Sequence, residues 1–440
     1  MRRGMSSLCG MLTALWLCAA AANAADIGLS VDKTALSVTS GDAFVFTLAI
    51  PRPTDVAVKV YDGSGKFVRT LWEKYTTDTQ AQVPWNMKDD AGAFVGKGTY
   101  TVRMETGFGL AIDKSFGKDG VLTGSGTTAF ISPWDIVTDA TGDIYLLDGG
   151  AATVYKFKPD GSPANDFAGK NTIIAPKAPL WDSLAVGADG RLYLPDTRST
   201  SHVIEVRDPK SGAVIYTIGG FGDVRWKTEK GSIAYPTWVG INGDHLYATS
   251  PAYMIFCAWD SRKPGKTGAL WITPPSGVGD AGATDGKKAI YLASAYWAHK
   301  AELGKYLDQD EWSKPCYTVH TYFDPGQNKT VTLDDINGVA CDGERGLFLV
   351  ERAPVKILKF FDKGAGLDFV TSFGKAGNDA EKLEFVAPHS AAVSPDGKAL
   401  YVAEDGEVVS KENTAHGLAR LVKYDVRYAA EKEVKVTVNP

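Results

Sequence analysis

The sequence predicts an all-β protein in which a small β-sandwich precedes a six-bladed β-propeller. Three observations support this fold class. A strand–turn–strand motif recurs six times, its period is close to that of four-stranded propeller blades, and the residues before the first copy follow a different pattern. In the clearest copy, at 385–405, an alternating strand leads through the turn sequence Ser-Pro-Asp-Gly into a second alternating strand. A lone hairpin cannot bury its apolar face, so the copies are expected to pack as a ring of sheets.

Each of the six copies carries an aromatic residue in its second strand, and these residues recur at intervals of 44 to 57 residues. A third strand with an apolar–charged–apolar pattern usually follows, as at 154–157 and 421–424. The sixth copy has no clear fourth strand. We therefore expect the segment around 114–116 to complete the last blade and close the ring, which removes two open sheet edges. The six aromatic residues are Tyr145, Tyr193, Tyr247, Tyr291, Phe348 and Tyr401.

This pattern resembles the NHL-type six-bladed propellers, and the predicted propeller domain spans residues 107–428. The fourth copy is the weakest, and an insertion at 296–316 follows it. In the insertion, Leu303, Tyr306 and Leu307 are spaced at i, i+3 and i+4, which predicts a short amphipathic helix. Such an insertion could be a lid over the channel or a simple loop elaboration.

Residues 25–106 form the predicted sandwich. They contain a D-x-x-G-x-x-V-R-x-L hairpin, a Trp-Asn turn followed by Met87, and a G-x-Y-x-x final strand. This combination resembles the FlgD-type immunoglobulin-like domain, which usually has glycine at the position of Met87; the resemblance implies an appended spacer or adhesion module. Trp85 and Tyr100 are expected to anchor the core, the alternative being a glycan-binding face. The tail at 429–440 contains strand-like residues without a predicted place.

Residues 1–24 have the pattern of a secretory signal peptide. Arg2 and Arg3 precede an apolar run at 11–22, which ends at an Ala-Asn-Ala cleavage site. We therefore expect a periplasmic or extracellular protein. Without this segment the chain has 45 basic and 52 acidic side chains, a net charge of −7. Mild acidity without basic clusters disfavours nucleic acid as a partner, and no later apolar run predicts an integral membrane segment.

Three cysteines remain after removal of the signal peptide. Cys257, Cys316 and Cys341 are an odd set, so at most one disulfide is expected among them, with its pairing open. None lies in a C-x-x-C or C-x-x-C-H motif. The sequence therefore indicates neither a zinc ribbon nor covalently attached haem.

The start of the innermost strand of each blade is expected to crowd the mouth of the central channel. The fourth blade offers only glycine there. The tryptophans at these places could wall a pocket that stacks on sugar rings or aromatic groups, with an amide and an imidazole as polar orienters; alternatively they pack blade against blade. The candidate ligand-binding residues are Trp134, Trp181, Trp238, Asn337 and His389.

A second ring of polar residues follows the second strand of each copy. Four of its members are carboxylates, which could bind calcium or magnesium or act as an acid and a base. Alternatively, each accepts hydrogen bonds from the turn that follows it. Glu351 and Glu404 are the metal-ligand candidates. The whole ring is Asp148, Asp196, Ser250, Ser294, Glu351 and Glu404.

Two families of propeller enzymes provide the alternative to a binding role. The peptidyl-hydroxyglycine amidating lyases, also NHL propellers, hold zinc on histidines from several blades, but only His389 stands at an innermost-strand start here. The regucalcin-type calcium lactonases need Glu, Asn and Asp in the channel, and Asn337, Glu351 and Glu404 would be the counterparts. No Ser-His-Asp elbow, phosphate loop or dinucleotide motif appears.

We expect an exported, non-catalytic binding or scaffold protein that presents a propeller face to a glycan or protein partner, without a cofactor. The alternative is a metal-dependent hydrolase or lyase with calcium or zinc in the central channel. A third possibility is a subunit of a larger surface assembly, held through the FlgD-like module.

Overall fold

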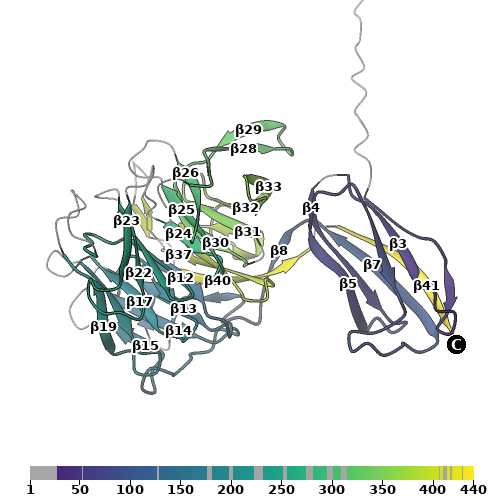
Figure 1. The fold of residues 1–440 in the computed structure, drawn as a ribbon, viewed down its shortest axis with the longest axis horizontal. Coiled ribbons are helices and arrows are strands. Elements are labelled where there is room, and N and C mark those ends of the chain that lie inside the picture. Colours follow the sequence, from purple (N-terminus) through teal and green to yellow (C-terminus); the bar gives the residue numbers. More distant parts are fainter. Residues whose placement is uncertain are drawn as a thin grey trace, which may run out of the picture. The chain divides into compact units, whose positions relative to one another are not determined.

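The protein is all-β (Figure 1). The computed structural model describes residues 27–440 except 52, 126–127, 176–180, 198–201, 222–230, 251–254, 274–280, 295–300, 309–314, 344, 406, 410–413, 417–418 and 429. The predicted signal peptide at 1–24 lies outside the described residues. Among the described residues the only helix is a single 3-10 turn, η2 (Ala380–Lys382), and no helix there is long and apolar enough to cross a membrane.

The chain divides into two compact units. Unit 1 comprises Met1–Thr106 and Ala430–Pro440, and unit 2 comprises Gly107–Ala429. The segment expected as a separate tail is therefore a strand of unit 1, where it pairs in parallel with one strand and antiparallel with another. Unit 1 has two sheets, β1 (Gly28–Val31)–β3 (Phe44–Ala49)–β6 (Gln80–Trp85) and β2 (Ala35–Ser37)–β41 (Ala430–Asn439)–β7 (Gly98–Thr106)–β4 (Thr54–Tyr61)–β5 (Phe67–Thr76).

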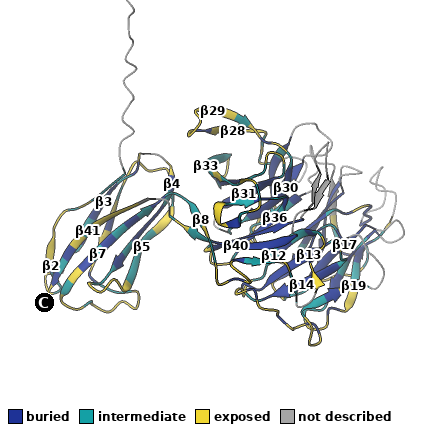
Figure 2. Cartoon of the chain, turned by 180° about the vertical axis from the view of Figure 1, so that it is seen from behind, coloured by how far each residue is buried: buried dark blue, intermediate teal, exposed yellow. Residues whose placement is uncertain are grey.

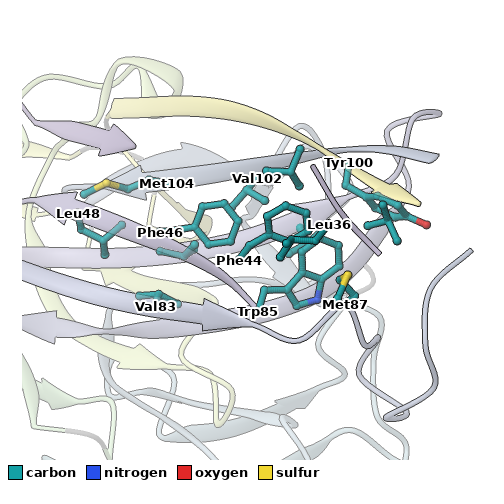
Figure 3. Packing of buried hydrophobic residues seen from close by; sticks show 14 of the residues in the cluster. Leu36, Phe44, Phe46, Leu48, Val83, Trp85, Met87, Tyr100, Val102 and Met104 are labelled. Atoms are coloured by element: carbon teal, nitrogen blue, oxygen red, sulfur yellow. The ribbon is translucent and has the colours of Figure 1, made fainter. Parts of the chain in front are cut away.

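Unit 1 is held by one apolar core (Figure 3). Trp85 and Tyr100 are both buried, with ring centroids 5.4 Å apart, and Phe44 stacks on the indole at 5.8 Å. Their polar atoms are satisfied locally, because Trp85 Nε1 donates to the Lys88 carbonyl (2.9 Å) and the Tyr100 hydroxyl to the Gly96 carbonyl (2.7 Å). The prediction that both are core anchors is confirmed.

Met87 has a backbone conformation that normally favours glycine. Its φ is +58°, in the left-handed region that side chains disfavour. Its side chain is nevertheless buried in the core (Figure 3). The strain is thus offset by the apolar area that the thioether side chain buries.

Unit 2 contains, among its described residues, six antiparallel sheets of four or more strands. Successive sheets meet through their first strands, and the first strand of the sixth sheet lies against that of the first, which makes the arrangement cyclic and propeller-like. Figure 2 shows inner strands such as β13 and β17 buried over their length, because sheets cover both of their faces.

The strands of the six sheets follow one another along the chain. The first three sheets are β12 (Pro133–Thr138), β13 (Ile144–Asp148), β14 (Thr153–Phe157), β15 (Thr172–Ile174); β16 (Ala185–Val186), β17 (Leu192–Asp196), β18 (Val203–Arg207), β19 (Val214–Gly219); and β20 (Trp238–Asn242), β21 (His245–Ser250), β22 (Ile255–Asp260), β23 (Ala269–Thr273). The fourth and fifth are β24 (Ala281–Thr284), β25 (Ala289–Ser294), β26 (Glu302–Leu307), β27 (Tyr317–Val319); and β30 (Ile336–Cys341), β31 (Gly346–Glu351), β32 (Lys356–Asp362), β33 (Leu367–Phe373). The sixth is β36 (Pro388–Val393), β37 (Ala399–Glu404), β40 (Arg420–Arg427) and β8 (Gly109–Ile112), with β9 (Val121–Leu122) also on β40.

Short two-stranded elements connect or flank these sheets. They are β10 (Gly124–Ser125) with β11 (Thr128–Ala129), β28 (Thr321–Asp324) with β29 (Lys329–Thr332), β34 (Lys375–Ala376) with β35 (Glu384–Phe385), and β38 (Glu407–Val409) with β39 (Thr414–His416).

Two predictions about unit 2 need correction. The strand that completes the sixth sheet is β8 (Gly109–Ile112), and residues 114–116, which were expected to do this, form a turn. Residues 302–307 form strand β26 and no helix. Leu303 and Tyr306 are both buried although their spacing suggested one helical face, because a strand covered on both sides buries consecutive residues.

Candidate binding site at the start of the first strands

The candidate site is built on β-bulges. In the first, fifth and sixth sheets the first strand opens with a residue paired to the carboxylate that ends the second strand, as Pro388 pairs with Glu404. The register then shifts by one residue, and the extra residues are Trp134, Asn337 and His389. A bulged residue is turned out of the regular alternation, so these three side chains are presented at the same end of neighbouring sheets.

The other two predicted tryptophans do not occupy this position. Trp181 pairs with Asp196, one place before the bulge; it is 1% exposed, with the Arg207 guanidinium 5.0 Å from its ring. Trp238 stands one place after the position equivalent to the bulge, where it pairs with Thr249. The three tryptophans were expected at equivalent places, and that expectation was wrong because a one-residue shift is invisible in an alignment of motifs.

Trp238 lies between the third and fourth sheets. Its Nε1 donates to the Gly282 carbonyl at 2.9 Å, and a Cβ added at Gly282 would lie 2.8 Å from the indole. Gly282, the residue that the sequence analysis found at this place in the fourth sheet, therefore leaves room for the Trp238 indole because it has no side chain. The residues that stand at the bulge position of the second and third sheets are Asp182 and Thr237.

Trp134 and His389 fix each other's orientation. The Trp134 indole donates to Ser132 Oγ at 2.8 Å and lies on Gly149, where a Cβ would come within 2.1 Å of the ring. His389 Nδ1 lies 2.6 Å from the Trp134 carbonyl oxygen. Because a carbonyl only accepts, Nδ1 carries the proton and Nε2 of the neutral ring keeps its lone pair. Burial lowers the pKa of His389, against the opposing effect of Asp405, so the imidazole is neutral at pH 7.

The sequence reasoning missed two charged residues that act on His389, Arg352 and Asp405, and a third, Asp335, that precedes β30. Arg352 Nη2 lies 3.3 Å from Asp405 Oδ2, and the Arg352 backbone N–H donates to the Asp335 carbonyl at 3.0 Å. Burial raises the pKa of Asp335, and the Arg352 charge partly opposes that shift. One signal could have found two of them, because Arg352 and Asp405 each directly follow a member of the predicted carboxylate ring, Glu351 or Glu404.

The carboxylate ring itself holds the loops that enter the first strands. Asp148 accepts from the backbone N–H groups of Ile131 (2.7 Å) and Ser132 (2.9 Å), and also from Ala151 in the turn that follows it. The predicted alternative, hydrogen bonds from the following turn, thus describes part of its role. The larger part is to pin the preceding loop.

Glu351 and Glu404 are engaged in the same way within separate sheets. Glu351 accepts from the Asp334 N–H (2.9 Å) and pairs with Lys356 Nζ (2.9 Å). Glu404 accepts from the Val386 N–H (2.5 Å) and from Arg420 Nε (2.6 Å). Burial raises the pKa of both glutamates, against the effect of these donors. Among the described residues no group of three or more His, Cys, Asp or Glu side chains is placed to hold a metal ion.

A cavity of about 260 Å³ lies among the first strands of all six sheets. Its walls are mostly small and apolar, from residues such as Val239, Ala283 and Ala391, and among the described residues Asp135 is the one charged residue in the lining. Asp135 accepts from the Leu184 N–H (2.9 Å) and the Ser390 hydroxyl (2.8 Å), so it ties the first sheet to the second and sixth. Burial raises its pKa, and these donors oppose the shift. With its oxygens so occupied, Asp135 fastens the ring of sheets.

The three cysteines of the described chain are free thiols. Cys257 is buried, Cys316 is exposed, and Cys341 donates from Sγ to the Thr284 carbonyl at 2.9 Å. The last of these joins the first strands of the fifth and fourth sheets. It supports the cavity wall without forming a reactive centre of its own, because burial raises its thiol pKa to about 12.

No protein-family model and no curated protein sequence matches this chain. Among solved structures, a protein of unknown function from Bacteroides thetaiotaomicron is 14% identical (TM-score 0.49; 91% of this chain and 98% of that chain covered). The WD40 repeats of RRP9 are 12% identical (TM-score 0.47; 73% and 100%), and virginiamycin B lyase from Staphylococcus aureus is 12% identical (TM-score 0.40; 73% and 99%).

Proposed function

We propose that this chain is an exported, non-catalytic binding protein. In this proposal an FlgD-type immunoglobulin-like sandwich accompanies a six-bladed NHL-like propeller, whose face at the start of the first strands takes a glycan or protein partner. One observation carries it: three adjacent sheets use β-bulges to present an indole, an amide and an imidazole at one end, beside the Arg352–Asp405 pair. Side chains of such mixed chemistry suit recognition of a partner.

The carboxylates favour binding over metal-dependent catalysis. The two glutamates nominated as metal ligands each accept a backbone N–H and pair with a lysine or arginine of their own sheet. A metal would have to displace these donors, which would free the loops that enter β30 and β36. The engagement of these two glutamates therefore disfavours the lactonase alternative, which required them as ligands.

The test uses the protein that lacks residues 1–24. We expect it to contain no stoichiometric metal, to show no change in melting temperature after chelation, and to capture a glycan from an array or a protein from an extracellular fraction. Replacing both Trp134 and Asn337 by alanine should abolish capture while leaving the fold intact by circular dichroism. A stoichiometric calcium or zinc ion, or turnover of a lactone or ester panel, would contradict the proposal.

A further inference from the structure

Resting on the proposed function, we propose that the ligand of this face is an uncharged carbohydrate, bound over the fifth, sixth and first sheets alone. The site consists of a stacking surface and a set of planar hydrogen-bonding groups. Its members are Trp134, Asn337, His389, Arg352 and Asp405.

One hydrogen bond, one ion pair, the effect of that pair on His389 and one close backbone approach place these residues near one another. Trp134 is linked to His389 through its carbonyl, and the charges of Asp405 and Arg352 act on the imidazole. The next residue after Asn337, Gly338, lies against the backbone of His389, since a Cβ added at Gly338 would be only 2.8 Å from the His389 carbonyl oxygen. A side chain larger than hydrogen at 338 would therefore push β30 from β36. The group is compact because glycine permits the two first strands to touch.

The hydrogen-bonding capacity of the group matches a polyol. Asn337 offers both a donor and an acceptor, His389 Nε2 in the neutral ring is an acceptor, and the guanidinium–carboxylate pair of Arg352 and Asp405 offers both. Vicinal hydroxyl groups donate and accept in the same way. The indole of Trp134 is half-buried, fixed on one side by Gly149, and an aromatic face of this kind packs on the C–H face of a sugar ring.

The charges disfavour an acidic sugar. Arg352 is already paired with Asp405, His389 is neutral, and Asp335 together with the exposed Asp334 adds negative charge at the same end. Within the part of the chain that the structure describes, a uronate would meet these carboxylates without an unpaired cation at this end to offset them. An uncharged ligand leaves the Arg352–Asp405 pair intact and requires no further compensation.

The second and third sheets provide a control surface on the same ring. At the places equivalent to the bulges stand Asp182 and Thr237, and the tryptophans of these two sheets are buried in the packing. Thr237 Oγ1 is buried and has no hydrogen-bond partner among the described residues. Thr237→Val is thus an isosteric change at the equivalent place, outside the proposed site.

The experiment is saturation-transfer NMR on the protein without residues 1–24. The probes are the methyl glycosides of glucose, galactose, mannose and N-acetylglucosamine, together with methyl glucuronide and methyl glucosaminide. We expect transfer to at least one uncharged glycoside. Asn337→Ala and Arg352→Lys should each weaken its binding about tenfold, as loss of a hydrogen bond to a polar ligand does, and Thr237→Val should leave it unchanged.

Three outcomes would overturn the inference: no transfer to any uncharged glycoside, transfer only to a charged one, or transfer that neither site variant weakens. Melting temperatures of the variants separate loss of binding from loss of fold. If no glycoside binds but a protein partner is captured through Trp134 and Asn337, the proposed function stands and this inference fails. If neither is captured, both fail.

Discussion

The two units bury different kinds of side chain. Among the described residues, the buried polar side chains of unit 1 are three threonines, Thr54, Thr76 and Thr106. Unit 2 buries acids and bases throughout its sheets, among them Asp148, Asp196, Glu351, Glu404, Lys156, Arg207, Lys305 and Arg420. The core of unit 1 is therefore an apolar contact between two sheets, whereas unit 2 combines apolar packing with buried charges.

The difference follows from what each architecture must hold in place. Two facing sheets are fixed once their apolar faces meet. A cyclic set of sheets must also fix every loop that enters a first strand, and a buried carboxylate that accepts backbone N–H groups does so. The same loops carry the bulges, so the buried charges of unit 2 position its candidate binding site.

The largest effect is expected from a charge placed in the apolar unit. Val436→Asp puts a carboxylate into the unit 1 core, where it has no partner, and should cost at least about 4 kcal/mol. Calorimetry should then show loss of the unit 1 transition with that of unit 2 retained. Lys435→Asp, at the exposed neighbouring position, is the control and should shift neither transition measurably. Loss of both transitions in Val436→Asp would contradict the division.

A smaller effect is expected from breaking a buried ion pair of unit 2. Arg420→Ala leaves the fully buried Glu404 carboxylate without its cation and should cost about 3–5 kcal/mol in denaturant unfolding. Arg427→Ala removes an exposed pair with Asp425 and should cost less than about 1 kcal/mol. Equal costs for the two variants would mean that the buried charges of unit 2 do not hold its loops.

Met87 allows the strain within the apolar core to be measured. Met87→Ala removes core contacts while keeping the positive φ, and should cost about 2–3 kcal/mol. Met87→Gly removes the same contacts but relieves the strain, and should cost about 1 kcal/mol less. Urea unfolding of both variants gives the difference directly. A glycine variant less stable than the alanine variant would exclude strain at this residue.

The smallest effect is a pH dependence at the candidate binding site. The folded-state pKa of His389 lies below the ordinary value of 6.5, so between these two values the unfolded chain binds a proton that the folded chain does not. Stability should therefore fall as the pH falls through this window. Melting temperatures between pH 7 and pH 5 should show a shallower decline for His389→Gln than for the native protein. Parallel curves would show that His389 does not titrate in this window.

Local patterns in the sequence predicted the repeated architecture well. The turns and the second-strand aromatics predicted the strands correctly, and Trp85 and Tyr100 were correctly expected in a core. These features depend on residues close together in the chain, where turn chemistry and alternation act directly. Glu351 and Glu404 are structural residues, as the alternative to metal binding proposed, but their backbone donors, Asp334 and Val386, lie in the preceding loops and not in the turn that was expected to supply them.

Features that depend on distant residues or on register were not predicted. The bulges separate Trp134 from the apparently equivalent Trp181 and Trp238, and a bulge leaves no mark on composition. Arg352 and Asp405 come together from different sheets. The pairing of β41 with β7 joins segments more than 300 residues apart, so nothing in either segment specifies the partner.

The position of β41 also has a consequence for biosynthesis. This strand lies between β2 and β7 in unit 1, yet the ribosome makes it only after every residue of unit 2. Unit 1, although its first strands emerge early, must wait with an apolar edge uncovered until unit 2 has been translated. Unit 1 is therefore the first unit to be started and the last to be completed. In the interval its uncovered strand edge would need protection, for example by a chaperone.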